Sequence, residues 1–160
     1  MSTKASFAED LAAARVMAII RGRDQTAVVE TAVALFEEGV RFVEVALTTV
    51  GALPAIEQIR SRAPQGSLVG AGTVLTATDV ADVVAAGAQF IVTPAVAPSI
   101  EAGAQRGLPV AAGALTPTEA WTAVQRGASA VKLFPASAGG PAYLRARARS
   151  YLAVAERFPA

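Results

Sequence analysis

The stretch QRGASAVKLF, residues 125–134, contains the unit from which the fold is built. It begins with the polar end of a helical pattern, continues through Gly127, and runs into the short apolar segment AVKLF. A glycine directly after a helix suits the left-handed residue that ends many helices. A short apolar run suits a parallel strand that is covered on both faces. The stretch therefore predicts the passage from a surface helix into a buried strand.

The same passage from helix through glycine to strand occurs three more times along the chain. EEGVRFVEV occupies residues 37–45, AAGAQFIV occupies residues 85–92, and QRGLPVAA occupies residues 105–112. Successive apolar runs start about 20–26 residues apart, which is the length of one βα unit in a right-handed parallel architecture. We therefore predict an α/β fold of the TIM-barrel type, with six βα units instead of the usual eight.

The predicted elements follow from these patterns and their punctuation. The strands are residues 16–20, 41–47, 67–74, 89–94, 108–113 and 130–134, and the helices are residues 25–38, 52–62, 77–86, 97–106, 117–126 and a tail of about 141–157. Thr116 and Glu119 have the spacing of a capping box around a helix that starts at Pro117. Because no Gly- or Ser-rich linker interrupts the series, residues 1–160 are predicted to form a single barrel-like domain.

The composition excludes several classes of function. A formal net charge of +1 gives no reason to expect nucleic acid or an anionic membrane as the main partner. The chain has no cysteine and no histidine, so disulfides, thiolate catalysis, the Ser-His-Asp triad and Cys- or His-ligated metal sites are excluded. No apolar run approaches the length of a membrane span, and the N-terminal residues do not resemble a signal peptide. We expect a soluble cytoplasmic protein.

Lys132 is out of place in its surroundings. The chain has twelve arginines and two lysines, and this lysine lies inside an apolar strand pattern. Alternation puts Val131 and Leu133 on one side of the strand and Lys132 on the other, which is the interior of a closed barrel. Burial lowers the pKa of an amine, and an unprotonated amine can attack a ketone to form a Schiff base. A lysine that reaches solvent from an edge strand, or that pairs with a buried acid, would show the same pattern.

Glu44 is the second unusual residue, since it is the only carboxylate inside a predicted strand. Val43 and Val45 take one face of that strand and Glu44 takes the other. A buried acid needs a partner, and Lys132 is the natural one, with a proton-carrying water between them. A plain buried ion pair remains the alternative.

Two features mark the ends of predicted strands. Arg21 follows the first strand, at the end where α/β barrels bind their ligands, and it suits a carboxylate or phosphate, although a surface arginine would look the same. The segment VGAGT, residues 69–73, contains two glycines. The third glycine of a dinucleotide-binding fingerprint would fall at position 75, which is Leu75, so that interpretation fails.

Six collinear blocks resemble the aldolases of 2-keto-3-deoxy-6-phosphogluconate (KDPG) and 2-keto-3-deoxy-6-phosphogalactonate. The blocks are VMAIIRG, GVRFVEVAL, VGAGTVLT, AGAQFIVTP, GLPVAAGALTPTEA and VKLFPASAGGPAYL, and the resemblance as a whole covers about residues 7–145. The resemblance implies a class I aldolase on a (β/α)8 barrel that needs no metal or other cofactor. It implies cleavage of 2-dehydro-3-deoxy-6-phospho sugar acids to pyruvate and glyceraldehyde 3-phosphate. It also implies a homo-oligomer, usually a trimer.

The same resemblance implies roles for five residues. Lys132 would be the Schiff-base lysine and Glu44 the general acid/base. Arg21 and Thr73 would contact the keto acid substrate, and Pro94 would line the pyruvate pocket. Many phosphogluconate-type members carry an arginine where this chain has Thr48, so the gluconate and galactonate substrates both stay open.

The last two strands of the family, with their phosphate-binding turns, have no counterpart in this sequence. We therefore expect a domain that is shortened at its C-terminus or internally deleted. The six-stranded sheet could close as a strained barrel, be completed by neighbouring chains, or belong to an engineered or degenerate scaffold. A catalytically impaired scaffold that acts as an oligomeric assembly module is thus the alternative to an active aldolase. The missing turns argue against a third possibility, a phosphate-ligand binding protein.

Overall fold

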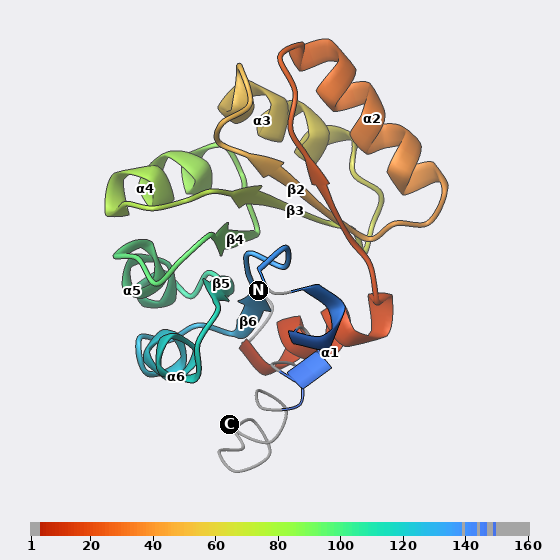
Figure 1. Cartoon of the computed structure of the whole chain (residues 1–160). Helices are drawn as coiled ribbons and strands as arrows, with labels where there is room; N and C mark the ends of the chain where they lie inside the picture. Colours follow the sequence, from red (N-terminus) through yellow and green to blue (C-terminus); the bar gives the residue numbers. More distant parts are fainter. Residues whose placement is uncertain (1–3, 139, 144, 147–148, 150–160) are drawn as a thin grey trace.

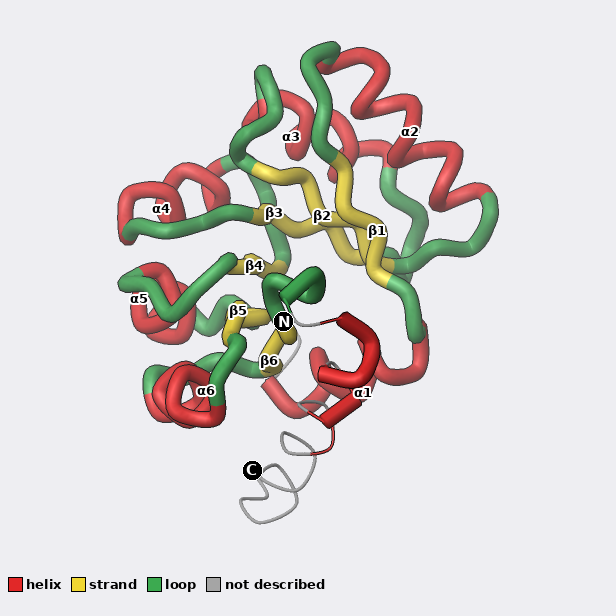
Figure 2. Tube along the Cα trace, in the orientation of Figure 1, coloured by secondary structure: helices red, strands yellow, loops and turns green. Residues whose placement is uncertain are grey.

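In the computed structural model, which describes residues 4–138, 140–143, 145–146 and 149, the chain alternates between helix and strand (Figures 1 and 2). The strands are β1 (Met17–Ile20), β2 (Phe42–Ala46), β3 (Leu68–Gly72), β4 (Phe90–Thr93), β5 (Val110–Ala114) and β6 (Ala130–Leu133). The helices are α1 (Lys4–Ala14), α2 (Gln25–Glu37), α3 (Ala52–Arg62), α4 (Ala77–Ala85), α5 (Ser99–Gln105) and α6 (Pro117–Gln125).

The predicted α/β repeat is confirmed. All six predicted strands are present, and they pair in parallel in their sequence order. Gly127 of the stretch QRGASAVKLF follows α6 with a φ of 99°, so it is the left-handed residue that ends the helix. Thr116 and Glu119 form the predicted capping box at the start of α6. That residues 1–160 form a single domain stays a prediction.

One predicted helix begins later than expected, and another falls mostly outside the described residues. The helix expected at residues 97–106 begins at Ser99, because Pro98 is its N-cap. The predicted tail helix, residues 141–157, lies largely outside the described residues, and those that are described there are helical. No described helix is long and apolar enough to cross a membrane.

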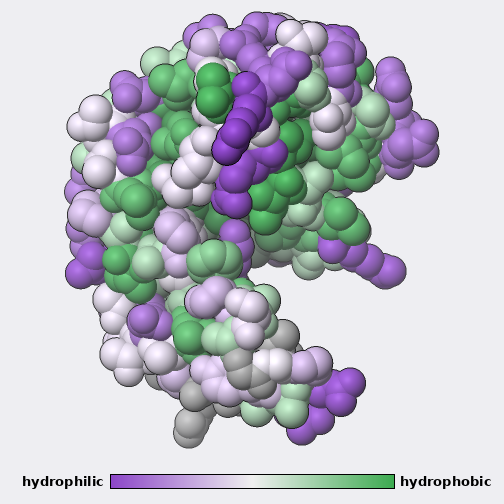
Figure 3. Space-filling model, turned by 45° about the horizontal axis from the view of Figure 1, so that its top comes forward, coloured by the Kyte–Doolittle hydropathy of each residue, from purple (hydrophilic) through white to green (hydrophobic). Residues whose placement is uncertain are grey.

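The sheet curls into half a barrel and stays open. Strands β1 and β6 are its two edges, and within the described chain they do not pair with each other. The space-filling view shows an arc that is open on one side (Figure 3). A strained, closed six-stranded barrel, one of the expected outcomes, is therefore wrong for this part of the chain. The curvature of these six strands leaves the two edge strands apart (Figure 3).

The two faces of the sheet are covered differently. Valines of β2 and β3 point outward and are buried under the helices, together with Ile56 and Ile59 of α3. The inner face carries a second core, in which the rings of Phe42 and Phe90 pack against Phe7. The ring centroids are 5.5–5.9 Å apart in tilted or edge-to-face pairs. We call these three side chains the aromatic floor.

Helix α1 supplies Phe7 and was missed by the sequence analysis. Its only large apolar side chains are Phe7 and Leu11, set among alanines, so its amphipathic pattern is weak. Phe7 is nevertheless fully buried, and Leu11 packs beside it on the inner core. The helix therefore covers the end of the half-barrel at which β2 and β4 begin (Figure 1).

Candidate active site

Glu44 and Lys132 are the only charged residues inside the described strands, and both lie on the inner face. Glu44 alternates with Phe42, which belongs to the aromatic floor. Lys132 alternates with Ala130, which packs against that floor. Side chains two residues apart on a strand share a face, so both charged groups stand one layer above the aromatic floor, toward the carboxyl ends of the strands.

The Glu44 carboxyl is almost fully enclosed. The residue is 3% exposed, and its Oε2 atom has no hydrogen-bond partner in the described chain. Burial raises the pKa of the Glu44 carboxyl above its ordinary value, because the charged form loses its hydration. The positive charges of Lys132 and Arg21 oppose part of that rise in the pKa. A carboxyl in this setting can hold a proton closer to neutral pH than an exposed glutamate can.

Lys132 is half-buried and lies over an aromatic ring. Its Nζ is 5.0 Å from the ring centroid of Phe134, at the distance of a cation–π contact. Lys132 and Glu44 form no ion pair, so the plain buried ion pair considered from the sequence does not describe them. They interact through space, since the lysine charge acts on the pKa of the carboxyl.

Pro94 packs against β5, the strand that pairs with the Lys132 strand β6. In the sheet register Lys132 is opposite Gly113 of β5. A Cβ added to Gly113 would come within 2.4 Å of the carbonyl carbon and oxygen of Pro94. The backbone after β4 therefore presses directly on β5 at the level of the lysine, and only a glycine leaves room for this contact.

Arg21 follows β1 and is held by the loop after β2. Its Nε donates a hydrogen bond of 3.0 Å to Oγ1 of Thr48. Its terminal guanidinium nitrogens have no partner among the described residues, so they are available for a carboxylate or phosphate. Both Arg21 and Thr48 are exposed, at the mouth of the half-barrel.

Thr73 directly follows β3 in the left-handed region, with a φ of 60°. A β-branched residue pays for this conformation, at a cost of order 1–3 kcal/mol, and such strained residues concentrate at functional sites. Thr73 is at the same end of the sheet as the other predicted site residues, but no side-chain hydrogen bond connects it with them. No group of three or more Asp or Glu side chains that could hold a metal ion occurs in the part of the chain that the structure describes.

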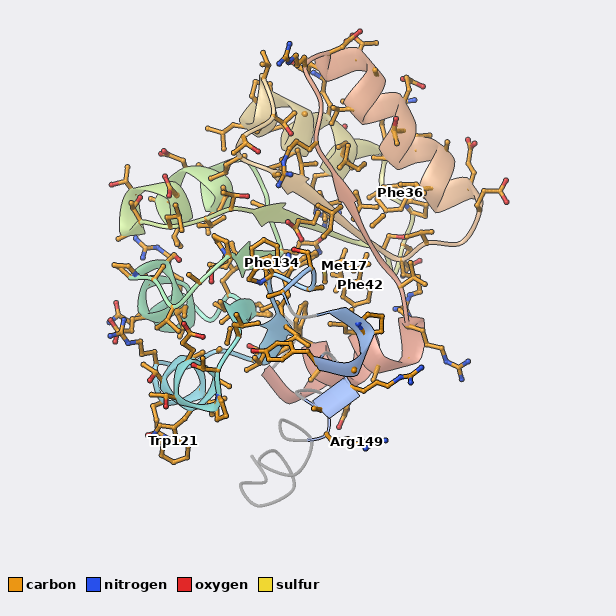
Figure 4. All side chains as sticks on the ribbon, viewed as in Figure 1. Met17, Phe36, Phe42, Trp121, Phe134 and Arg149 are labelled. Carbon is orange, nitrogen blue, oxygen red and sulfur yellow. The ribbon has the colours of Figure 1, made fainter. Side chains whose placement is uncertain are left out.

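Two residues beside the site were not recognised as part of it from the sequence. Phe134 follows Lys132 by two residues and so shares its face, a spacing that could have identified it. In the view of Figure 4 it is labelled toward the middle of the arc, as are Met17 and Phe42. Thr48 was noted only because the family often has arginine there, and its bond to Arg21 joins residues 27 positions apart.

The chain is similar to known proteins along most of its length. A family profile described as KDPG and KHG aldolase matches residues 7–156. A probable 2-dehydro-3-deoxy-6-phosphogalactonate aldolase of Rhizobium meliloti is 38% identical over 82% of this chain and 62% of its own length. A 2-dehydro-3-deoxy-phosphogluconate aldolase of Treponema pallidum is 39% identical over 91% of this chain and 70% of its own length.

A solved structure shares the fold. The KDPG aldolase of Legionella pneumophila, with pyruvate captured as a covalent carbinolamine intermediate, superimposes with a TM-score of 0.69 at 30% identity. The match covers 89% of this chain and 66% of that one. The chain thus spans about two thirds of the length of these relatives, and less than that of the Rhizobium meliloti protein. From the profile match over nearly all of its residues, the chain belongs to the KDPG and KHG aldolase family.

Proposed function

We propose that the chain is a class I aldolase that cleaves 2-dehydro-3-deoxy-6-phospho sugar acids to pyruvate and glyceraldehyde 3-phosphate. One observation carries the proposal: the only two charged residues in the described strands share the inner face, and the charge of Lys132 acts on the buried carboxyl of Glu44. Imine chemistry needs an amine and an acid that are close enough to interact, in surroundings that limit hydration.

Lys132 acts as the nucleophile. Its unprotonated Nζ attacks the 2-keto carbon, a carbon–nitrogen bond forms, and the keto oxygen takes up a proton to give a carbinolamine. Loss of water leaves an iminium ion. The bond between C3 and C4 then breaks as the C4 hydroxyl loses its proton, and the electron pair moves toward the iminium nitrogen. Glyceraldehyde 3-phosphate leaves, and the enamine remains on Lys132.

Glu44 moves the protons, directly or through a water molecule. It gives a proton to the departing carbinolamine hydroxyl, accepts one from the C4 hydroxyl, and returns one to the enamine carbon before hydrolysis releases pyruvate. Its raised pKa suits both directions of transfer, and a positioned acid/base is typically worth about 10²–10⁴-fold in rate. A carboxylic acid kept in an apolar site is a familiar way to achieve this.

The remaining predicted residues would bind the small keto acid. The free guanidinium nitrogens of Arg21 suit the substrate carboxylate. Thr73 and Pro94, at the ends of β3 and β4, would complete the wall around the pyruvate portion. The Legionella pneumophila relative holds pyruvate as a carbinolamine, which supports pyruvate as the keto acid bound here. Relatives named for the gluconate and for the galactonate substrate match similarly well, so both sugar acids are to be assayed.

Reductive trapping tests the proposal. Pyruvate and borohydride are added to the protein, and intact-mass and peptide mass spectrometry locate any reduced adduct. The chain makes this test clean, because Lys4 and Lys132 are its only lysines. We expect one reduced pyruvate group, on Lys132. Lys4→Arg is the matched control and should keep the adduct, whereas Lys132→Arg should lose it. No adduct on the wild-type chain contradicts the aldolase proposal.

The open sheet favours a second candidate, an oligomeric assembly module without catalysis. Strand β1 exposes 51% of Ile19 on the inner face, and Phe134 is 40% exposed. Unpaired edge strands and uncovered apolar side chains favour association. The family resemblance supports a homo-oligomer, and within it a trimer. Light scattering gives the mass in solution, and a defined oligomer without a lysine adduct would favour this second candidate.

A further inference from the structure

The carboxyl of Glu44 occupies the place of a missing side chain. Gly72 is the last residue of β3 and lies opposite Ala46 of β2 on the inner face. A Cβ built on Gly72 would lie 1.7 Å from Oε1 of Glu44, 2.5 Å from its Cδ and 2.9 Å from its Cγ. These separations are far below van der Waals contact, so no other residue type fits while Glu44 keeps its position.

The neighbouring glycine on the same face has a different occupant. Gly70 is the direct register partner of Glu44, and a Cβ there would lie 2.4 Å from the ring of Phe90. The aromatic floor therefore fills the space beside Gly70. The carboxyl of Glu44 leans instead toward Gly72, which is the carboxyl end of β3 and the side of the substrate-binding loops.

We propose that Gly72 is a positioning residue for Glu44, and this inference rests on the aldolase function proposed above. By having no side chain it leaves a recess that seats Oε1, while the phenylalanine ring beside Gly70 closes the alternative place. Oε2 has no partner within the described chain, so it is the atom available for proton transfer. Gly72 itself touches no reacting atom and acts only through the carboxyl.

A methyl group at position 72 would displace the carboxyl. The Glu44 side chain can turn about its own bonds, whereas the strand backbone is fixed by its ladder on both sides. A misplacement of about 1 Å in a catalytic group can cost about 10²-fold in rate. We therefore expect Gly72→Ala to lower kcat about 10²-fold with a much smaller change in KM, because the residues that would bind the substrate are untouched.

A shorter acid provides the rescue. Glu44→Asp removes one methylene, so its carboxyl can retreat from a methyl group at position 72. The double variant Gly72→Ala/Glu44→Asp should be less impaired than the product of the two single losses predicts. Gly70→Ala is the matched control on the same strand and face. Its methyl group meets Phe90 and not Glu44, so Glu44→Asp should bring it no such recovery.

A readout that does not depend on catalysis separates this inference from the proposed function. Carbon NMR of a chain with labelled glutamate follows the Glu44 carboxyl, assigned by its absence in Glu44→Gln. In Gly72→Ala the pKa of this carboxyl should fall toward its ordinary value, and in Gly70→Ala it should not. Failure of the pyruvate trap removes the aldolase proposal and leaves this titration as a valid test of Gly72.

The outcomes against the proposal are specific. An unchanged kcat and an unchanged Glu44 titration in Gly72→Ala would overturn it, as would equal recovery of both alanine variants by Glu44→Asp. If Gly72→Ala does not fold, Glu44→Ala in the same chain should restore folding, because the clash is then gone. Absence of that restoration would also overturn the proposal.

Discussion

The inner face of the half-barrel has two layers that differ in almost every respect. The aromatic floor is closed, with Phe7, Phe42 and Phe90 at 0% exposure. One layer higher the burial is uneven: Glu44 is 3% exposed, while its register partner Ile19 is 51% exposed. The same strands and the same alternation produce both layers. What differs is the cover, since α1 packs on the floor, whereas the cover of the upper layer encloses Glu44 and leaves Ile19 exposed.

This contrast suggests that the aromatic floor serves stability and the upper layer serves chemistry. Burial and mutual packing of the three rings should contribute several kcal/mol to the free energy of unfolding. The upper layer lies directly on these rings. The upper layer keeps a buried carboxyl with one unpaired oxygen and a half-buried amine, and burial of such polar groups costs stability. Substitutions in the floor should therefore affect folding, and substitutions above it should affect activity.

Among variants that keep Lys132, Glu44→Gln should have the largest effect in the upper layer. The amide keeps the shape of the carboxyl but cannot donate and accept the catalytic proton in turn. We expect kcat for retro-aldol cleavage to fall about 10²–10⁴-fold. Reductive trapping should still mark Lys132, more slowly. Steady-state assays with both sugar acids measure this loss, and an unchanged kcat would remove Glu44 from the mechanism.

Replacing phenylalanine by alanine should affect mainly stability in the floor and mainly the trapping rate in the upper layer. Phe42→Ala opens a cavity in the floor and should cost about 3–5 kcal/mol of unfolding free energy. Phe134→Ala removes a ring that is already 40% exposed, so it should lower the unfolding free energy by only about 1 kcal/mol. It should instead alter the rate of pyruvate trapping, because the ring lies under Nζ of Lys132.

Urea unfolding of both alanine variants, beside trapping rates, makes this comparison. Equal losses of stability in the two variants would mean that the upper layer is part of the structural core, and the separation of the layers would then fail.

Most of the fold was predictable because it repeats. Glycines after helices and short apolar runs indicated all six strands in their order. Helix α1 was not predicted, since Phe7 and Leu11 among alanines give too weak a pattern, and its burial depends on rings from distant strands. Six strands in the sequence indicated that an ordinary eight-stranded barrel could not form. Only the structure shows that the sheet stays open and does not close into a smaller barrel.

The candidate site was predictable where a charged residue is costly in its place. Lys132 and Glu44 are conspicuous because apolar strands do not otherwise contain charges. Gly72 gave no such signal, since a glycine at a strand end has several explanations and the carboxyl that fills its recess comes from another strand. The hydrogen bond from Arg21 to Thr48 could not be predicted from the sequence either, because it depends on how the loops after β1 and β2 pack together.

A smaller effect concerns the pH dependence of stability. Between the ordinary glutamate pKa of 4.5 and the raised pKa of Glu44, the folded protein holds a proton that the unfolded chain has released. Unfolding free energy therefore falls as the pH rises through this window, and the full cost applies above it. Glu44→Gln lacks this cost. Its stability relative to the wild type should increase across the window and level off above it.

Thermal unfolding of the two proteins between about pH 4 and pH 8 gives the difference directly. The pKa values of Glu30, Asp79 and Glu119 are lowered in the folded state, and their acid-side loss of stability is common to both proteins and cancels. A stability difference that is constant with pH would contradict the raised pKa of Glu44.

The smallest effect should come from Thr48, which holds Arg21 through one exposed hydrogen bond of 3.0 Å. Thr48→Val keeps the shape and removes the acceptor, whereas Thr48→Ser keeps the hydroxyl. One such bond is worth about 0.5–1.5 kcal/mol, so the valine variant should raise KM roughly two- to tenfold and leave kcat nearly unchanged. The serine variant should stay close to the wild type. Because Arg21 also lies near enough to act on Glu44, a loss in kcat instead of KM would mean that the arginine serves the acid rather than the substrate.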